Sequence, residues 1–245
     1  AKGEIIDPIN PETGKSWGWS DVADLNYDNQ GLRAAMTADM LHWIKNENID
    51  GFRCDVAGNV PLDYWQQAIP QLRKEKNIFM LAEAWEPELL KEGLFDMAYG
   101  WEAHHTMNRI AQGKNTVKDW DKFMAENDIK YSSDDILMNF VDNHDENSWN
   151  GTIRGRLGKG EEAMTALSYV MPGMPLIYSG NEYGLNHSLK FFEKDSIPKT
   201  KGKDWELRAK LGKLKTENTA LNGGKNRAKY TRIKTDDDTN ILAFT

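Results

Sequence analysis

Arg53 and Asp55 stand two positions apart in the sequence I-D-G-F-R-C-D-V, at residues 49–56. Side chains alternate along a strand, so on a strand these two would project from the same face. A guanidinium beside a carboxylate favours the ionised carboxylate and lowers its pKa. Such a carboxylate can act as a nucleophile or stabilise a positive charge, although a single Arg-x-Asp pair is more often a structural ion pair.

Two more acidic residues follow apolar stretches further along the chain. Glu83 comes directly after the apolar residues 78–82, and Asp145 ends the sequence D-N-H-D that follows residues 136–141. A carboxyl group on a buried strand, close to another negative charge, has a raised pKa and can donate a proton. The sequence therefore contains candidates for both an ionised and a protonated carboxyl group.

The elements that would position these acids are short strands alternating with helices. Apolar runs predict five strands, at residues 49–56, 78–82, 95–99, 136–141 and 175–178. Apolar residues at helical spacing predict helices at about 29–47, 61–72, 101–112, 116–127, 161–170 and 204–217, with Pro70 kinking or ending the second. This alternation indicates right-handed βαβ units and a parallel sheet, an α/β fold. In such sheets the chemistry lies at the carboxyl ends of the strands, which is where Asp55, Glu83 and Asp145 stand.

The composition excludes several classes of protein. The 245 residues carry a net charge of −7 without a basic stripe, so we expect no nucleic-acid partner. Hydrophobic residues make up 39%, and no apolar run approaches the roughly 18 residues that cross a bilayer, so we expect no membrane segment. The single cysteine, Cys54, excludes an internal disulfide. The opening A-K-G-E lacks the features of a signal peptide, and the sequence does not indicate a compartment.

Four motifs, in order, resemble those of the α-amylase family of glycoside hydrolases, whose catalytic domain is a (β/α)8 barrel. They are G-F-R-C-D at 51–55, A-E-A-W at 82–85, V-D-N-H-D at 141–145 and P-G-M-P-L-I-Y-S-G-N-E at 172–182. The spacings of 28 residues between Asp55 and Glu83 and of 62 between Glu83 and Asp145 fit the family's fourth, fifth and seventh strands. The resemblance implies a partial TIM barrel, about strands 4–8, followed by the first strands of an all-β domain.

The resemblance assigns a catalytic role to each of the three acids. Asp55 matches the nucleophile, Glu83 the general acid/base, and Asp145 the third acid, which holds sugar hydroxyls. A retaining glycosidase needs two carboxyl groups about 5–5.5 Å apart, one ionised to attack and one protonated to donate. We therefore expect retaining hydrolysis of α-1,4-glucosidic bonds in starch, glycogen or malto-oligosaccharides. An α-glucan transglycosylase of the same family is one alternative, and a non-catalytic glucan-binding relative is another.

Four further residues are candidates for substrate binding. Arg53 matches the arginine that orients the nucleophile, and His144 matches a histidine that contacts sugar hydroxyls. Trp85 can stack on a sugar ring, and Asn59 can line the cleft. Many relatives carry Lys-His where this chain has Gly58-Asn59. No metal ligand is assigned and the residues present require no cofactor, whereas the family resemblance allows Ca²⁺ in the full-length protein.

The resemblance also predicts the domain organisation. Residues 1–28 would end an inserted region that leads into the barrel, 29–224 would form the second part of the barrel, and 225–245 would begin a truncated C-terminal β-sandwich domain. The family's first three barrel strands have no counterpart in the chain. We expect the same full-length polypeptide to supply them and an α-glucan to be the partner. Residues 1–245 alone are expected to be inactive.

Overall fold

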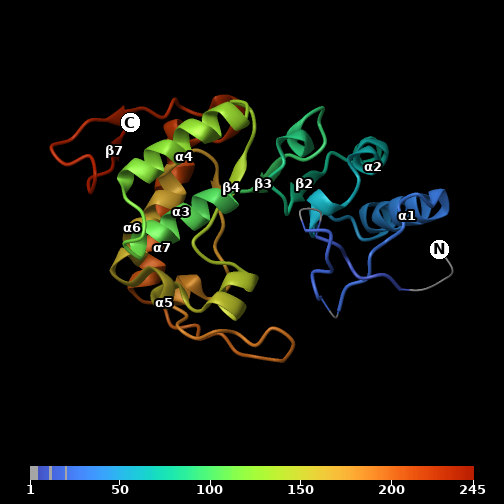
Figure 1. The fold of residues 1–245 in the computed structure, drawn as a ribbon, viewed down its shortest axis with the longest axis horizontal. Coiled ribbons are helices and arrows are strands. Elements are labelled where there is room, and N and C mark those ends of the chain that lie inside the picture. The colour runs from blue at the N-terminus through green and yellow to red at the C-terminus, as the bar shows by residue number, and fades with distance from the viewer. Residues whose placement is uncertain (1–4, 11–12, 20) are drawn as a thin grey trace. The chain divides into compact units, whose positions relative to one another are not determined.

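The computed structural model describes residues 5–10, 13–19 and 21–245 (Figure 1). Its contacts group the chain into two compact units. One comprises the residues up to Phe52 together with Asn59–Phe79, and the other comprises Arg53–Gly58 together with Met80–Thr245. Part of the predicted first domain lies outside the described residues. The predicted boundaries after residues 28 and 224 remain predictions.

The first unit contains two helices, α1 (Gln30–Asn46) and α2 (Leu62–Glu75). Asn29 is the N-cap of α1, and its side chain accepts hydrogen bonds from two backbone N–H groups of the first turn. Helix α2 does not end at Pro70 but continues to Glu75. Pro70 lies on the exposed side of the helix, and buried side chains on both sides of it hold the last turn in place.

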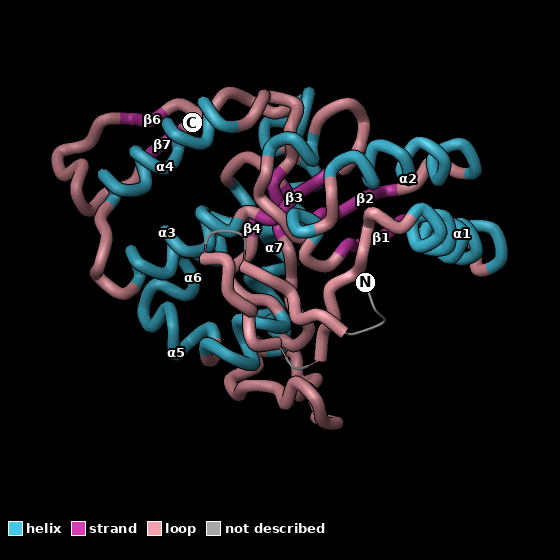
Figure 2. Tube along the Cα trace, turned by 45° about the vertical axis from the view of Figure 1, so that its right-hand side comes forward, coloured by secondary structure: helices cyan, strands magenta, loops and turns pink. Residues whose placement is uncertain are grey.

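Five short strands form one sheet in the order of the sequence, β1-β2-β3-β4-β5 (Figure 2). They are β1 (Gly51–Cys54), β2 (Phe79–Ala82), β3 (Met97–Tyr99), β4 (Leu137–Asn139) and β5 (Met174–Pro175). Each pair from β2 to β5 is parallel, and helices or helical turns join successive strands. The predicted α/β fold with a parallel sheet is confirmed. In such a sheet the carboxyl ends of neighbouring strands lie at one edge, which favours a shared site.

The last strand of the sheet differs from the prediction. The sequence predicts a strand over 175–178, but β5 pairs with β4 only through Met174 and Pro175. One further hydrogen bond, from the backbone N–H of Leu176 to the carbonyl of Asn139 (2.8 Å), extends this pairing. Proline has no N–H to donate, so this strand forms few ladder bonds and its end is difficult to place from apolar residues alone.

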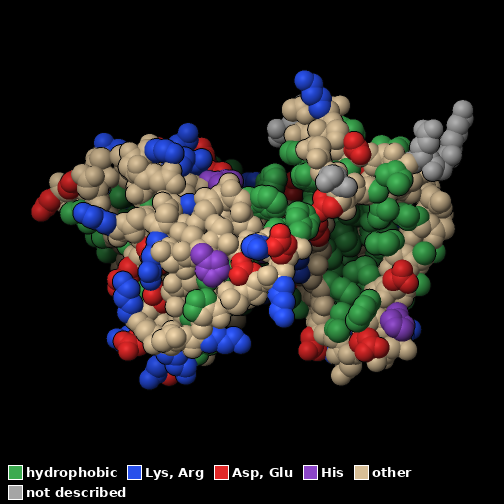
Figure 3. All heavy atoms as spheres, turned by 90° about the horizontal axis from the view of Figure 1, so that it is seen from below, with side chains coloured by type: hydrophobic (Ala, Val, Ile, Leu, Met, Phe, Trp, Pro, Cys, Tyr) green, Lys and Arg blue, Asp and Glu red, His purple; other side chains and the backbone are tan. Residues whose placement is uncertain are grey.

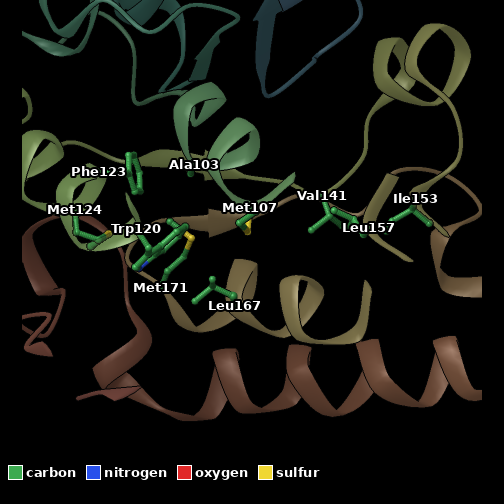
Figure 4. Packing of buried hydrophobic residues seen from close by; sticks show 10 residues of the cluster. All are labelled: Ala103, Met107, Trp120, Phe123, Met124, Val141, Ile153, Leu157, Leu167 and Met171. Carbon is green, nitrogen blue, oxygen red and sulfur yellow. The ribbon is translucent and has the colours of Figure 1, made fainter. Parts of the chain in front are cut away.

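The second unit contains five helices and a buried apolar cluster (Figure 4). The helices are α3 (Trp101–Ala111), α4 (Val117–Lys130), α5 (Ile153–Leu157), α6 (Glu161–Val170) and α7 (Lys203–Glu217). The buried cluster comprises Ala103, Met107, Trp120, Phe123, Met124, Val141, Ile153, Leu157, Leu167 and Met171. Burying a large apolar side chain stabilises a fold by about 1.5–3 kcal/mol. Because Val141 belongs to this cluster, the segment that leads to Asp145 is anchored in the core.

The end of the chain forms an antiparallel pair, β6 (Arg232–Ile233) with β7 (Ala243–Phe244). The Nε atom of Arg232 donates a 2.9 Å hydrogen bond to Asp121 of α4, which ties this pair to the second unit. The sequence predicts β strands in this region, and two short paired strands are present. That it begins a β-sandwich domain remains a prediction.

The surface carries charges of both signs. Acidic and basic side chains are interspersed on the face shown in Figure 3, without a continuous basic stripe. Across residues 5–10, 13–19 and 21–245, no helix is long and apolar enough to cross a membrane.

Candidate active site

Arg53, in β1, connects two of the predicted catalytic acids. Its Nη1 atom donates a hydrogen bond to Asp55, and its Nη2 atom lies 3.1 Å from Oε2 of Glu83. The Asp55 side chain is 70% exposed, whereas that of Glu83 is 14% exposed. The two carboxyl groups therefore share one guanidinium in different environments, one open to solvent and one largely enclosed.

The environment of Glu83 favours its protonated form. Burial raises the pKa of Glu83 to about 7, from an ordinary value of 4.5. The N–H of Val56 and the charge of Arg53 act in the opposite direction, and the charge of Asp55 and a side-chain hydrogen bond with it add to the increase. A carboxyl group with a pKa near neutrality keeps its proton through much of the range in which an exposed carboxylate is ionised.

An unusual backbone conformation at Val56 holds Glu83 in place. Val56 has a φ of +43°, a conformation that β-branched residues rarely adopt. Its N–H donates a 2.9 Å hydrogen bond to Oε2 of Glu83, and the N–H of Ala57 donates to the Glu83 carbonyl (3.1 Å). The Glu83 N–H in turn donates to the carbonyl of Cys54 (3.0 Å). The turn after β1 therefore fixes both the backbone and the carboxyl group of Glu83.

Tyr99, the last residue of β3, extends the site toward the third acid. The Nε atom of Arg53 donates a 3.1 Å hydrogen bond to the Tyr99 hydroxyl, and the guanidinium lies 5.6 Å from the Tyr99 ring centre. Burial raises the pKa of Tyr99, the hydrogen bond and charge of Arg53 oppose this effect, and the charges of Glu83 and Asp145 add to the increase. Tyr99 thus lies within electrostatic range of both acids. The sequence motifs do not include Tyr99, although its place at the carboxyl end of a predicted strand indicates a site residue.

Asp145 and His144 follow β4. The Nε2 atom of His144 lies 3.3 Å from Oδ2 of Asp145, and both side chains are partly exposed. Burial raises the pKa of Tyr178, and the charges of Asp142 and Asp145 raise it further. Asp145 therefore lies within electrostatic range of both tyrosines, Tyr99 and Tyr178.

A buried arginine holds the segment that carries Asp145. The Nη2 atom of Arg156 donates to Oδ1 of Asp142 (2.7 Å) and to the carbonyl of Val141 (3.0 Å), and its Nε atom donates to the carbonyl of Gly151 (3.1 Å). Arg156 therefore binds the segment before and after Asp145. Burial raises the pKa of Asp142, while its hydrogen bonds with Asn181 and Arg156 oppose that effect. Nothing in the sequence motifs indicated this role for Arg156.

A model of the α-amylase catalytic domain matches residues 17–232 of this chain. The chain belongs to the α-amylase family.

Individual members of the α-amylase family are similar to this chain over part of their own length. Alpha-amylase MalA of Haloarcula japonica is 26% identical over 176 residues, which cover 71% of this chain and 26% of the relative. A 4-alpha-glucanotransferase of Thermotoga neapolitana is 27% identical over 175 residues, covering 66% of this chain and 37% of the relative. The structure of the noncanonic maltogenic alpha-amylase AmyB from Thermotoga neapolitana gives a TM-score of 0.81 at 27% identity, covering 96% of this chain and 55% of that one. The chain therefore spans from about a quarter to about half of these relatives.

Two predicted site residues of this α-amylase family chain remain, Trp85 and Asn59. The Trp85 ring is 53% exposed, while its backbone is held by hydrogen bonds to Oε2 of Glu86 (3.0 Å) and from the Tyr131 hydroxyl (2.5 Å). Trp85 follows Glu83 by two residues, and its side chain is open to solvent. Asn59 belongs to the first unit, and its part in the site remains a prediction.

The family resemblance allows a calcium ion in the full-length protein. Among those residues, no group of three or more His, Cys, Asp and Glu side chains could hold a metal ion. Calcium dependence therefore remains a prediction about the full-length protein and has no assigned ligand here.

Proposed function

We propose that the full-length protein hydrolyses α-1,4-glucosidic bonds of glucans with retention of the anomeric configuration. The single observation that carries this proposal is the arrangement around Arg53. One guanidinium contacts an exposed Asp55 and an enclosed Glu83 whose pKa is raised to about 7. A retaining glycosidase needs one carboxyl group that attacks and a second that donates a proton.

In the first step Asp55 acts as the nucleophile. Its carboxylate oxygen forms a bond to the anomeric carbon while the bond from that carbon to the glycosidic oxygen breaks. Glu83 transfers its proton to the departing oxygen. Arg53 orients Asp55 for the attack through the hydrogen bond from its guanidinium. The product of this step is a glucosyl ester of Asp55 and a released sugar hydroxyl.

In the second step Glu83 acts as the base. It takes a proton from water, the water oxygen bonds to the anomeric carbon, and the ester bond to Asp55 breaks. Two inversions give net retention. Asp145 and His144 would hold hydroxyls of the reacting sugar, because a carboxylate and an imidazole can accept and donate hydrogen bonds. Roles for Trp85 and Asn59 at the leaving-group side belong to the same proposal.

The experiment that tests this proposal is trapping of the glucosyl ester. An α-glucosyl fluoride whose 2-hydroxyl is replaced by fluorine slows breakdown of the ester, since the positive charge of the transition state is destabilised. Mass spectrometry of peptides from the treated full-length protein should find the added sugar on Asp55. A label on another carboxylate would refute the assigned roles.

Transglycosylation is the second candidate, favoured by the similarity to a 4-alpha-glucanotransferase. The chemistry of the first step is the same, and a sugar hydroxyl replaces water in the second step. An exposed aromatic ring such as Trp85 could hold that acceptor sugar. The two activities are distinguished by incubating maltotriose with the enzyme, since only transfer yields products longer than the substrate.

A further inference from the structure

Three aromatic side chains form an exposed cluster beside the segment that carries Asp145. The ring centres of Trp149 and Phe191 are 5.2 Å apart, those of Phe191 and Phe192 are 4.9 Å apart, and those of Trp149 and Phe192 are 6.3 Å apart. We refer to Trp149, Phe191 and Phe192 as the aromatic platform. None of the sequence motifs includes the two phenylalanines.

The aromatic platform is exposed to an unusual degree for rings that pack together. Trp149 is 60% exposed, Phe191 is 42% exposed and Phe192 is 72% exposed. Leaving apolar surface in water costs free energy in proportion to its area, about 25 cal/mol per Å². Contiguous exposed apolar patches rimmed by polar residues commonly mark binding sites. Lys190, Glu193 and Asp195 lie in the same loop as the two phenylalanines, and a salt bridge of 2.7 Å joins Lys190 to Glu193.

The platform is assembled before any ligand binds. Asn147 accepts a hydrogen bond from the backbone N–H of Leu189 (2.7 Å) and donates one to the carbonyl of His187 (3.3 Å). The hydroxyl of Ser148 donates to the carbonyl of Leu189 (2.9 Å). These bonds fasten the loop that carries Phe191 to the π-helical turn Glu146–Asn150, so the rings keep their spacing. A preorganised surface loses little conformational entropy when a ligand binds.

The platform is continuous with the candidate active site. The ring of His144 stacks on Phe191 at 6.2 Å between centres, and His144 lies 3.3 Å from Asp145. Trp85, by contrast, follows β2, which is separated from β4 by β3 in the sheet. A ligand chain that runs from Trp85 past the acids to His144 would therefore meet the aromatic platform next.

We propose that the aromatic platform binds glucose units of an α-glucan beyond those held at the catalytic acids. The proposal rests on the proposed function, because the ligand is the rest of the same substrate chain. A glucose ring has an apolar face of C–H groups and a polar rim of hydroxyls. The apolar face can lie on Trp149 and Phe192, and the rim can remain hydrated or reach Lys190 and Glu193. The consequence is a preference for longer chains.

The test compares two substrate lengths in the full-length protein. Trp149→Ala and Phe192→Ala remove exposed rings, and Ile129→Ala, which truncates an 88% exposed residue on α4, is the matched control. An aromatic contact contributes about 0.5–1.5 kcal/mol, which corresponds to a loss of up to about tenfold. We expect kcat/KM for maltoheptaose to fall by several-fold to about tenfold in each platform variant, with a change of less than about twofold for maltotriose. The control should leave both values unchanged.

Equal losses on both substrates, or no loss on either, would overturn the platform assignment. Phe192→Tyr retains the ring and should restore the preference for maltoheptaose, which separates loss of a binding surface from a folding defect. Calorimetric titration of maltoheptaose into the Asp55→Asn protein, with and without Phe192→Ala, tests binding without turnover. An unaltered Kd in that titration would also overturn the assignment. If the wild-type protein binds through the platform yet hydrolyses nothing, the proposed function fails while the platform stands.

A second copy of the chain is the other candidate occupant of this surface. Light scattering after size-exclusion chromatography should give the same mass for the wild type and Phe192→Ala. A dimer that dissociates on this substitution would contradict the glucan assignment.

Discussion

The Nη2 atom of Arg53 lies 3.1 Å from Oε2 of Glu83, yet the pKa of Glu83 is raised to about 7. Burial of the carboxyl group outweighs the attraction of the guanidinium, which also binds Asp55. Burial alone would lower the pKa of Arg53, but its hydrogen bond with Tyr99 and the charge of Glu83 raise it above its usual range. The arginine therefore stays charged at every pH at which the enzyme could act.

The first prediction concerns the pH dependence of activity. Glu83 must be protonated to donate, so kcat/KM should fall as pH rises through about 7, tenfold per pH unit well above that value. Because the charge of Arg53 lowers the pKa of Glu83, Arg53→Gln should move this alkaline limb to higher pH. The pH profiles of both proteins on one maltooligosaccharide check this. If the alkaline limb of the Arg53→Gln protein stays at the wild-type pH, or moves to lower pH, Glu83 is not the acid.

The second prediction concerns stability. The pKa of Glu83 is higher in the folded protein, about 7, than its ordinary value of 4.5. Its contribution to the free energy of unfolding is therefore fully present below about pH 4.5 and is lost as pH rises through about 7. Glu83→Gln removes this dependence and should be more stable than the wild type above pH 7, by at most about 3 kcal/mol. Urea denaturation at pH 5 and pH 8 measures the difference. An equal effect of the substitution at both pH values would show that folding does not raise the pKa of Glu83.

The positions of the three acids could be predicted because they depend on regular patterns. Short apolar runs placed Asp55, Glu83 and Asp145 after three strands of one sheet, β1, β2 and β4, and parallel pairing collects strand ends at one edge. Helix α6 (Glu161–Val170) has the predicted bounds, because its apolar spacing has no competing interpretation. The spacing of apolar residues was sufficient to predict these segments, because it determines which of their side chains are buried.

The residues that complete the site could not be predicted in this way. The φ of +43° at Val56 depends on the partner it meets, Glu83, which is 27 residues away. Arg156 reaches Asp142 only after α5 has folded against the core. Tyr99 ends a short strand whose pattern was weak, although its strand-end position would have justified naming it. These are tertiary contacts that leave no periodic signal in the sequence.

The third prediction concerns Arg156, a positioning residue. Arg156→Lys keeps the charge but cannot reproduce the planar set of hydrogen bonds to Asp142, Val141 and Gly151. We expect the free energy of unfolding to fall by about 2–4 kcal/mol, since buried acceptors lose their donors. Arg154→Lys is the control, because Arg154 is 39% exposed and should change stability by less than about 1 kcal/mol. Equal effects of the two substitutions in urea denaturation would refute the prediction.

The fourth prediction concerns Gly51 in β1. A Cβ atom at this position would lie 1.9 Å from the carbonyl oxygen of Phe79, so only glycine permits the close approach of the two backbones. Gly51→Ala should therefore destabilise the protein by about 3 kcal/mol or more, or prevent folding. Gly212 in α7 has open space around it, and Gly212→Ala should stabilise by up to about 1 kcal/mol. Thermal unfolding of both variants measures the contrast, and a tolerated alanine at position 51 would contradict the β1 geometry.

The most direct test of the proposed reaction is the anomeric configuration of the first product. Proton NMR can follow the full-length protein on maltoheptaose during the first minutes, before the products mutarotate, with Asp55→Asn as the inactive control. Attack by Asp55 and then by water inverts the anomeric carbon twice, so we predict α-anomers first, and no product from Asp55→Asn. Initial β-anomers from the wild type, or turnover by the Asp55→Asn protein, would contradict the retaining mechanism and the role of Asp55.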